Sequence, residues 1–533
     1  MLTILEFTAP TLDYARLAPF LIVIGAACLG VLAEAFVARS WRHEVQAGLA
    51  ILAPLAAIVT LLAQWGAPYG LADPAGQAGS VLVDGPTQLL WLLLLGFGLA
   101  GLLLFAERAA YGGRSAFTAA AASIPGSRAE AEAVQGGMSH TEVFPLALFS
   151  LSGMMLFTAA NDLLVLFVAL EIMSLPLYVL AALARHRRLG SQEAALKYFL
   201  LGVAASAMLL FGVALLFAYA GSFDFGAVAT AYGARTGQAD SLFVAGLGLT
   251  GVGLLFKLGA APFHMWAPDV YEGAPTPVTA FMSVGVKVAA VGALLRLFYV
   301  AFGAARWTWQ PVLVGVAIAT MAVGAVIGIV QSDIKRLLAY SSITHAGFVL
   351  VGVVGAVTLQ TGLAYGQLGS VGAVVVYVVA YGLATMAAFG AVTLVQSQGR
   401  EATSLASWSG LGRRYPWFGV VMAVALLSLA GIPPLAGFIG KLAVFQAAWQ
   451  GGYWWLALVA VLIALAAAYV YIRVLVVLFS RDWDPAVEVK APGPATVAVL
   501  TGGTVGSVLV GVWPGPLTDL IAQAADFIIT AGG

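Results

Sequence analysis

The chain has almost no cysteine and few charges. Its one cysteine, Cys28, cannot form an internal disulfide or supply the ligands of an iron–sulfur cluster. Charged residues make up 9% of the chain and hydrophobic residues 62%, whereas a soluble domain is about 25% charged. The formal net charge is +0, so nothing points to nucleic acid as a partner. The composition therefore predicts an all-α polytopic membrane protein.

Several motifs of soluble enzymes are also missing. The sequence contains no P-loop, no dinucleotide-binding glycine motif and no zinc-type cluster of His and Cys. Phosphate, dinucleotide and metal chemistry are therefore unsupported. The first residues, MLTILEFTAPTLDYAR, lack the basic start of a cleavable signal peptide. We expect the first span to act as the insertion signal and to remain in the protein.

Long apolar runs dominate what is present. A helix needs about 20 apolar residues to cross a bilayer, and fourteen runs of that kind occur. They lie near residues 18–38, 46–65, 88–106, 143–160, 163–183, 195–219, 241–262, 276–302, 310–330, 338–358, 370–396, 416–448, 453–479 and 494–514.

Two of these spans combine a lysine with proline. Pro262 follows Lys257 in span 7, and Pro433 and Pro434 precede Lys441 in span 12. Because proline interrupts helical hydrogen bonding, both helices are expected to be broken, although ordinary kinks are the alternative. Their separation by five spans predicts two five-helix repeats, spans 4–8 and 9–13, and an odd repeat length inverts the second.

This repeat divides the chain into four segments. Residues 1–142 hold three spans and a long loop, 143–302 the first repeat, 303–480 the second repeat, and 481–533 the last span and tail. Most loop lysines and arginines follow odd-numbered spans, which predicts that those loops are cytoplasmic and that both termini are periplasmic. The loop at 107–142 is rich in Ala, Ser and Gly. We expect it to be partly disordered, and trimming 115–135 to be tolerated.

Ionisable side chains deep in the spans are the candidate functional residues. A lysine near the bilayer centre costs at least ~2.5–3.5 kcal/mol, so it should face protein or water. Desolvation disfavours a buried ammonium and a nearby carboxylate favours it, so such groups can load and release protons. The candidates are Glu171, Lys197, Lys257, Lys287, His345 and Lys441.

Only Glu34 and Glu171 are acids well inside spans, so the buried lysines outnumber their possible partners. The pattern predicts a line of titratable groups across the membrane plane. For single residues a structural role stays open. Lys197 is shallow enough to form a simple ion pair, His345 can be a satisfied core histidine, and Arg296, near a span end, is expected to snorkel to the interface.

Four stretches resemble the antiporter-like membrane subunits of respiratory complex I. They are ALEIMSLPLYVL, FKLGAAPFHMWAPDVYEGAPTPVTAFMSVGVKVA, DIKRLLAYSSITHAGF and LAGIPPLAGFIGKL. The similarity covers about residues 85–480 and is strongest to subunit N, the homologue of mitochondrial subunit 2. Lys441 stands where subunit M carries a glutamate, and the chain ends soon after span 14, without the long lateral helix of subunit L.

The resemblance implies a proton-translocating subunit of NADH:quinone oxidoreductase in the bacterial inner membrane. Glu171 and Lys197 would form a coupling ion pair, and Lys257 would be the central proton carrier. Lys287 and His345 would pass protons on to Lys441, near the outer exit.

The resemblance also implies no redox cofactor in this chain, because NADH, FMN, iron–sulfur clusters and quinone are handled elsewhere in the complex. Partners would be neighbouring antiporter-like and small membrane subunits and the lipid bilayer. Two alternatives remain: a subunit of a multisubunit cation/proton antiporter or membrane-bound hydrogenase, and a non-pumping scaffold.

Overall fold

The structure is a computed structural model that describes residues 13–66, 79–124, 127–136, 138, 140–186, 188–235, 241–357 and 368–527. Helices make up nearly all of its regular structure, as the composition predicts. The helices of the first half are α1 (Tyr14–Phe36), α2 (Arg42–Ala63), α3 (Gly85–Phe105), α4 (Arg128–Gln135), α5 (Val143–Ala159), α6 (Leu163–Ala181), α7 (Arg188–Ala220), α8 (Phe225–Ala234), α9 (Ser241–Leu258), α10 (Trp266–Gly273), α11 (Thr276–Arg296) and the π-helix η1 (Leu297–Ala301).

The second half adds the remaining helices and one small sheet. The helices are α12 (Arg306–Ile329), α13 (Ile334–Gly355), α14 (Ser370–Val392), the 3-10 helix η3 (Leu405–Trp408), α15 (Leu411–Arg414), α16 (Pro416–Ala430), α17 (Ala436–Gln450), α18 (Trp454–Leu478), α19 (Pro494–Val512) and α20 (Gly515–Ala524). Strands β1 (Val395–Ser397), β2 (Arg400–Glu401) and β3 (Val487–Val489) form an antiparallel sheet in the order β2-β1-β3.

The helices confirm a polytopic membrane protein. Within the described residues, twelve helices are long and apolar enough to cross a bilayer, and α5 and α16 are shorter apolar helices of 17 and 15 residues. The number of fourteen spans, the inverted repeats and the four-part division of the chain stay predictions. The orientation of the termini also stays a prediction, and residues 1–12 and 528–533 lie outside the described residues.

Aspartates set where several spans begin. The side chains of Asp84, Asp162 and Asp333 accept hydrogen bonds from backbone N–H groups in the first turns of α3, α6 and α13. These N–H groups have no partner inside the helix, so a capping carboxylate stabilises the start of each span. The caps fix the position of the side chains that follow along α6 and α13.

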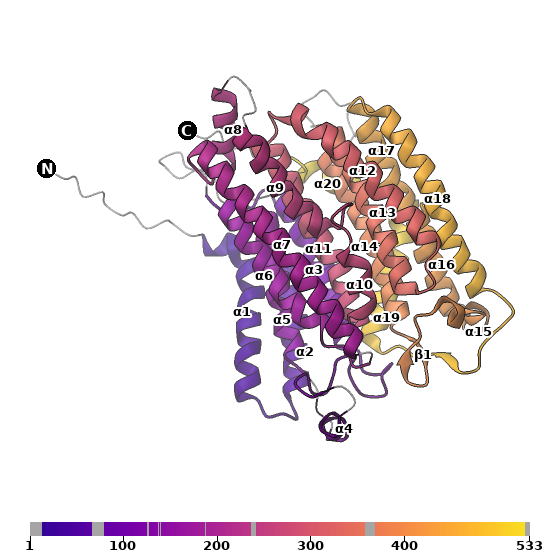
Figure 1. Cartoon of the computed structure of the whole chain (residues 1–533). Helices are drawn as coiled ribbons and strands as arrows, with labels where there is room; N and C mark the ends of the chain where they lie inside the picture. The colour runs from indigo at the N-terminus through magenta and orange to yellow at the C-terminus, as the bar shows by residue number, and fades with distance from the viewer. Residues whose placement is uncertain are drawn as a thin grey trace.

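Three helices form the centre of the molecule. The apolar stretches of α11 and α13 are completely buried, and that of α14 almost completely, whereas α1, α18 and α19 expose most of theirs. Figure 1 shows α11 and α14 between the helices of the first half and those of the second half. Polar side chains on these central helices therefore face protein rather than lipid.

The loop between α3 and α5 is more ordered than the composition indicates. Phe117 is 1% exposed and packs on Phe105, with ring centroids 5.1 Å apart. The backbone N–H of Thr118 donates to the carbonyl oxygen of Leu183 at 2.9 Å. Five consecutive buried side chains, at residues 115–119, and a β-bridge to the segment after α6 hold this part of the loop, and neither feature is visible in an Ala/Ser/Gly composition.

The prediction that Arg296 snorkels is wrong. Its side chain is 1% exposed and its Nη2 lies 2.5 Å from Oδ1 of Asp84, which is itself fully buried. Nη2 also donates to the hydroxyl of Thr87 at 2.6 Å. The helix end is covered by protein rather than by lipid, so the guanidinium finds a carboxylate instead of the interface.

Candidate functional site

The first break lies between α9 and α10, beside two lysines. Helix α9 ends at Leu258, and Gly259 then adopts a φ of +77°, a conformation that a side chain would strain. The helix end leaves carbonyl oxygens unpaired, and Nζ of Lys287 on α11 donates to the Leu258 carbonyl at 2.7 Å. A cation at a helix C-terminus also interacts favourably with the helix dipole.

Lys257, one residue before that helix end, sits among aromatic rings. Its Nζ lies 3.4 Å from the hydroxyl oxygen of Tyr178 and 5.4 and 5.5 Å from the ring centroids of Tyr178 and Tyr198. The side chain is 2% exposed. Aromatic faces attract an ammonium without fixing it in an ion pair, so this pocket can hold either the charged or the neutral amine.

The second break repeats this arrangement. Helix α16 ends at Ala430, Gly431 has a φ of +83°, and Nζ of Lys441 on α17 donates to the Ala430 carbonyl at 2.7 Å. Lys441 also lies 5.2 Å from the ring centroid of Phe348. Each break therefore presents a helix carbonyl end to one buried ammonium, and each contains a cis proline bond, Ala261–Pro262 or Pro433–Pro434.

His345 on α13 lies between the two breaks. Its Nδ1 is 2.5 Å from the hydroxyl of Tyr377 and its Nε2 is 3.1 Å from that of Tyr471. On the side of the second break, the ring of Phe348 lies 6.0 Å from the His345 ring and 5.2 Å from Nζ of Lys441. The residue thus contacts two hydroxyl groups that can accept and donate protons.

The acid end of the line differs from the expectation. Glu171 on α6 is half-buried, and its Oε1 has no hydrogen-bond partner among the described residues. Lys197 on α7 instead pairs with Glu193 at 2.8 Å and with Asp269 at 2.9 Å. The expected Glu171–Lys197 ion pair is therefore not formed in this structure.

The lysine line as a whole is not built from ion pairs. In the described part of the chain, Nζ of Lys257, Lys287 and Lys441 has no carboxylate oxygen within 4.0 Å. The described part of the chain also contains no group of three His, Cys, Asp or Glu side chains arranged to hold a metal ion. Protonation and deprotonation are the reactions that such side chains support.

Sequence reasoning missed the tyrosines and one aspartate. Tyr377 and Tyr381 are four residues apart on the buried α14, where a hydroxyl repeated once per turn is a signal that could have been read. Asp269 follows a proline-rich turn and was not considered as a partner of Lys197. Asp269 also pairs with Arg336, which is distant in sequence, with 2.7 Å between Oδ1 of Asp269 and Nη1 of Arg336.

Comparison with known proteins identifies the family. Residues 160–466 match the family model described as "NADH:quinone oxidoreductase/Mrp antiporter, TM". The match covers both breaks and all of the lysine line. The chain belongs to this family of antiporter-like membrane subunits.

Relatives within the family are similar over nearly the whole length. A Cutibacterium acnes protein named "NADH-quinone oxidoreductase subunit N" is 50% identical over 98% of this chain and 97% of its own. A protein of the same name from a Nocardioides species is also 50% identical, over 98% of this chain and 100% of its own. These names confirm the resemblance to the complex I antiporter-like subunits, and to subunit N among them.

Solved structures agree. A chain of respiratory complex I from Thermus thermophilus is 32% identical, with a TM-score of 0.75 over 97% of this chain and 100% of that one. A chain of the Mrp complex from a Dietzia species has a TM-score of 0.78 over 96% and 97% at only 20% identity, which shows a shared fold. The chain is thus an antiporter-like subunit of a membrane arm.

Proposed function

We propose that this chain translocates protons in the membrane arm of an NADH:quinone oxidoreductase. The observation that carries the proposal is the pair of helix breaks, each holding a buried lysine amine on backbone carbonyls without a carboxylate. An ammonium held only by dipoles and rings can give up its proton without leaving an unpaired carboxylate behind. Supporting this, the relatives at 50% identity bear the name of subunit N.

Protons would pass from the cytoplasm to the lysine line and leave on the other side. Lys257 and Lys287 share the first break, His345 relays charge through the Tyr377 and Tyr471 hydroxyls, and Lys441 at the second break is the last carrier. Glu171 would couple the line to a neighbouring subunit, because a change in its charge would change the proton affinity of Lys257. Lys197 would join that coupling through Asp269 rather than through Glu171.

The electrons would travel elsewhere in the complex. This chain would hold no redox centre and would receive energy through neighbouring membrane subunits, in a bacterial inner membrane with both termini on the periplasmic side. Electron transfer at remote cofactors would then change the charge at one end of the line. A displaced charge in a medium of low dielectric constant strongly changes the energy of its neighbours.

Substitution of Lys257 tests the proposal. Lys257→Met removes the proton carrier but keeps a side chain of similar length, so the complex should assemble while NADH-driven proton pumping falls severely. Lys257→Arg should also pump poorly, because arginine holds its proton at any relevant pH. Lys490→Met, which removes a lysine outside the spans, is the matched control. Normal pumping by assembled Lys257→Met complex would exclude a proton path through this residue.

A cation/proton antiporter is the second candidate, favoured by the fold shared with the Mrp chain. The two functions differ in the subunits with which the chain assembles and in whether it supports cation/proton antiport without redox subunits. A complex I subunit should co-purify with iron–sulfur and flavin subunits and should not complement an antiporter-deficient strain. Complementation by this chain with other antiporter subunits, and no association with redox subunits, would favour the antiporter.

A further inference from the structure

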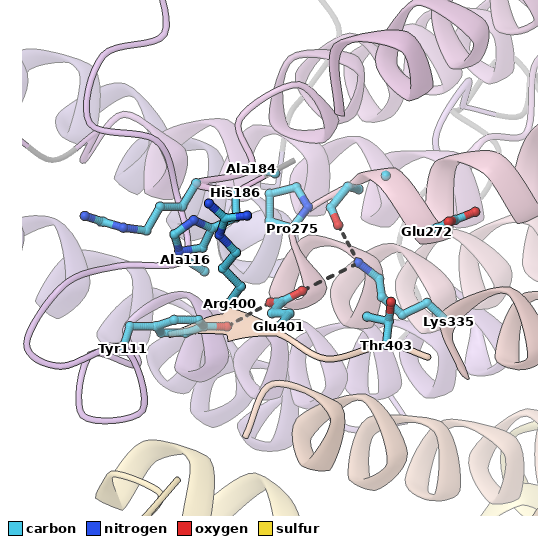
Figure 2. A pocket seen from close by; sticks show the side chains of 13 residues that line it. Tyr111, Ala116, Ala184, His186, Glu272, Pro275, Lys335, Arg400, Glu401 and Thr403 are labelled. Carbon is cyan, nitrogen blue, oxygen red and sulfur yellow. Dashed lines mark hydrogen bonds and ion pairs between the residues drawn. The ribbon is translucent and has the colours of Figure 1, made fainter. Parts of the chain in front are cut away.

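A cavity of about 320 Å³ opens on the side of the molecule that we expect to face the cytoplasm (Figure 2). Its walls come from the loop after α3, the segment after α6, the end of α10, the start of α13 and the β1–β2 hairpin. Figure 2 shows Lys335 and Tyr111 reaching Glu401 from opposite sides, with His186 and Arg400 nearby. None of these residues belongs to the lysine line.

Glu401 is the centre of the polar contacts in this cavity. Its Oε1 accepts a hydrogen bond from the Tyr111 hydroxyl at 3.2 Å and its Oε2 one from the Thr276 hydroxyl at 2.7 Å. Nζ of Lys335 lies 4.0 Å from Oε2 and donates to the carbonyl oxygen of Ala274 at 2.7 Å. The Glu401 side chain keeps 21% of its surface exposed and lines the cavity, so water in the cavity can reach this side chain.

Other charged groups line the same cavity. Burial lowers the pKa of His186, and Arg185 lowers it further, while Glu401 acts in the opposite direction. Burial also raises the pKa of Tyr111 well above its usual value, so this hydroxyl stays protonated. The titratable or charged side chains around Glu401 are those of Tyr111, Arg185, His186, Glu272, Lys335 and Arg400.

A stripe of hydroxyl groups leads inward from this carboxylate along α11. Thr276, Thr279, Ser283 and Lys287 are separated by three, four and four residues, which places them on one face of the helix. Both threonines and the serine are fully buried. A buried hydroxyl is costly unless it is hydrogen-bonded, and here Thr279 donates to the Tyr271 carbonyl at 3.1 Å and Ser283 to the Ala280 carbonyl at 2.9 Å. Their oxygens can still accept a proton, so the three hydroxyls place polar groups at intervals along one face of an apolar helix. The stripe covers about 16 Å, at 1.5 Å per residue.

A second polar stripe runs beside the first on α13. Lys335, Ser342 and His345 share a helix face there by the same spacing rule. The Tyr381 hydroxyl connects the two stripes, because it donates to the Ser342 hydroxyl at 2.8 Å and lies 3.2 Å from the Ser283 carbonyl oxygen. Both stripes start at the cavity and end on the lysine line.

We propose that Glu401 takes up protons from water in the cavity and passes them along the α11 stripe to Lys287. This inference rests on the proposed function. The carboxylate takes a proton from a cavity water, and the hydroxide left behind returns to bulk water. The new O–H of Glu401 gives its proton to the oxygen of the Thr276 hydroxyl, which releases its own proton to a water molecule between the hydroxyls, and the same exchange repeats at Thr279 and Ser283. The proton ends on the neutral amine of Lys287, and the regenerated Glu401 carboxylate is again held by Tyr111 and attracted to Lys335.

Glu401→Gln tests the proposal in the intact complex. The amide keeps the size of the side chain and one acceptor but cannot carry a proton. Uptake by a carboxylate matters most where protons are scarce, so pumping should fall at least about tenfold near pH 9 and much less near pH 6. The readouts are proton pumping and NADH:quinone turnover in membrane vesicles across this pH range, with complex content measured on native gels.

Two more variants separate uptake from a structural role. Thr276→Val removes the relay hydroxyl at nearly constant volume and should reproduce the alkaline loss, although all charges remain. Glu488→Gln changes a half-exposed carboxylate on β3 of the same sheet and should pump normally at every pH. A loss in Glu401→Gln that is equal at all pH values, or that follows a loss of assembled complex, would overturn the proposal.

The outcome can be told apart from a failure of the proposed function. If Lys257→Met abolishes pumping while Glu401→Gln pumps normally from about pH 6 to about pH 9, the lysine line stands and uptake at Glu401 is wrong. If Lys257→Met pumps normally, the proposed function itself fails.

Discussion

Removing the guanidinium of Arg296 should destabilise the protein strongly. Arg296→Met leaves Asp84 fully buried without the ion pair that its carboxylate now makes. Breaking a buried pair by removing one partner typically costs about 3–5 kcal/mol. The lower value already corresponds to a factor of at least about a hundred in an equilibrium constant. Because Arg296 lies at the end of α11, the same change loosens the helix that carries Lys287.

The assay is the amount and heat resistance of assembled complex in membranes, measured on native gels. A double variant shows whether the buried Asp84 charge, once Arg296 is removed, is responsible for the loss. Asp84→Asn keeps an acceptor for the first turn of α3, where Asp84 now receives the backbone N–H of Thr87, but removes the charge. Combined with Arg296→Met it should recover most of the lost complex. If Arg296→Met assembles at the normal level, or the double variant is as poor as the single one, the reasoning is refuted.

Three further predictions concern the line and the long loop. Lys441→Met should lower pumping at least about tenfold without loss of assembled complex, as measured by vesicle acidification; equal pumping would remove the second break from the path. Glu130→Gln should cost about 1–3 kcal/mol, because its carboxylate is 2.9 Å from the buried Arg188 guanidinium; unchanged heat resistance of the complex would contradict this. Phe117→Ala should lower the free energy of unfolding by about 3–5 kcal/mol and reduce the amount of assembled complex. Deleting 127–135 should have a smaller effect on assembly. Because residue 117 lies within 115–135, trimming that whole segment is now expected to prevent assembly.

Much of the architecture could be predicted because bilayer physics leaves few choices. Twenty apolar residues in a row can only be a spanning or buried helix, and a proline beside a lysine indicated where α9 and α16 end. The positions of Lys257, Lys287, His345 and Lys441 inside helices followed from the same patterns. Residue spacing could not show that each break offers a backbone carbonyl to a lysine of another segment, Lys287 at the first break and Lys441 at the second.

The failures have a common physical cause, which is that partners distant in sequence decide the environment of a polar group. Arg296 was expected at the interface because it lies near a span end, and its actual partner, Asp84, lies more than two hundred residues away in the sequence. The resemblance to the family implied a pair of Lys197 with Glu171, whereas in the structure Lys197 pairs with Asp269, which follows the break in the seventh span. The long loop was read from composition alone, and its buried side chains depend on the segment after α6.

On the β-sheet side of the molecule, hydrogen bonds join loops that lie far apart in the sequence. Glu107, after α3, accepts hydrogen bonds from the Gly493 N–H at 3.0 Å and the Thr496 hydroxyl at 2.5 Å, at the start of α19. Strand β1, after α14, pairs with β3, which precedes α19, and Gln396 of β1 donates to the Ala110 carbonyl.

These hydrogen bonds tie the loops of both halves of the chain into one connected layer on this side of the molecule. Transporters that rock one half of the molecule against the other need the two halves to separate at one surface during each cycle. In this chain, such a motion would break the hydrogen bonds between these loops and separate α11 from α14 at the centre. If this chain translocates protons as proposed, we therefore expect the helices to keep their places during a cycle, while only side chains, water and protons move.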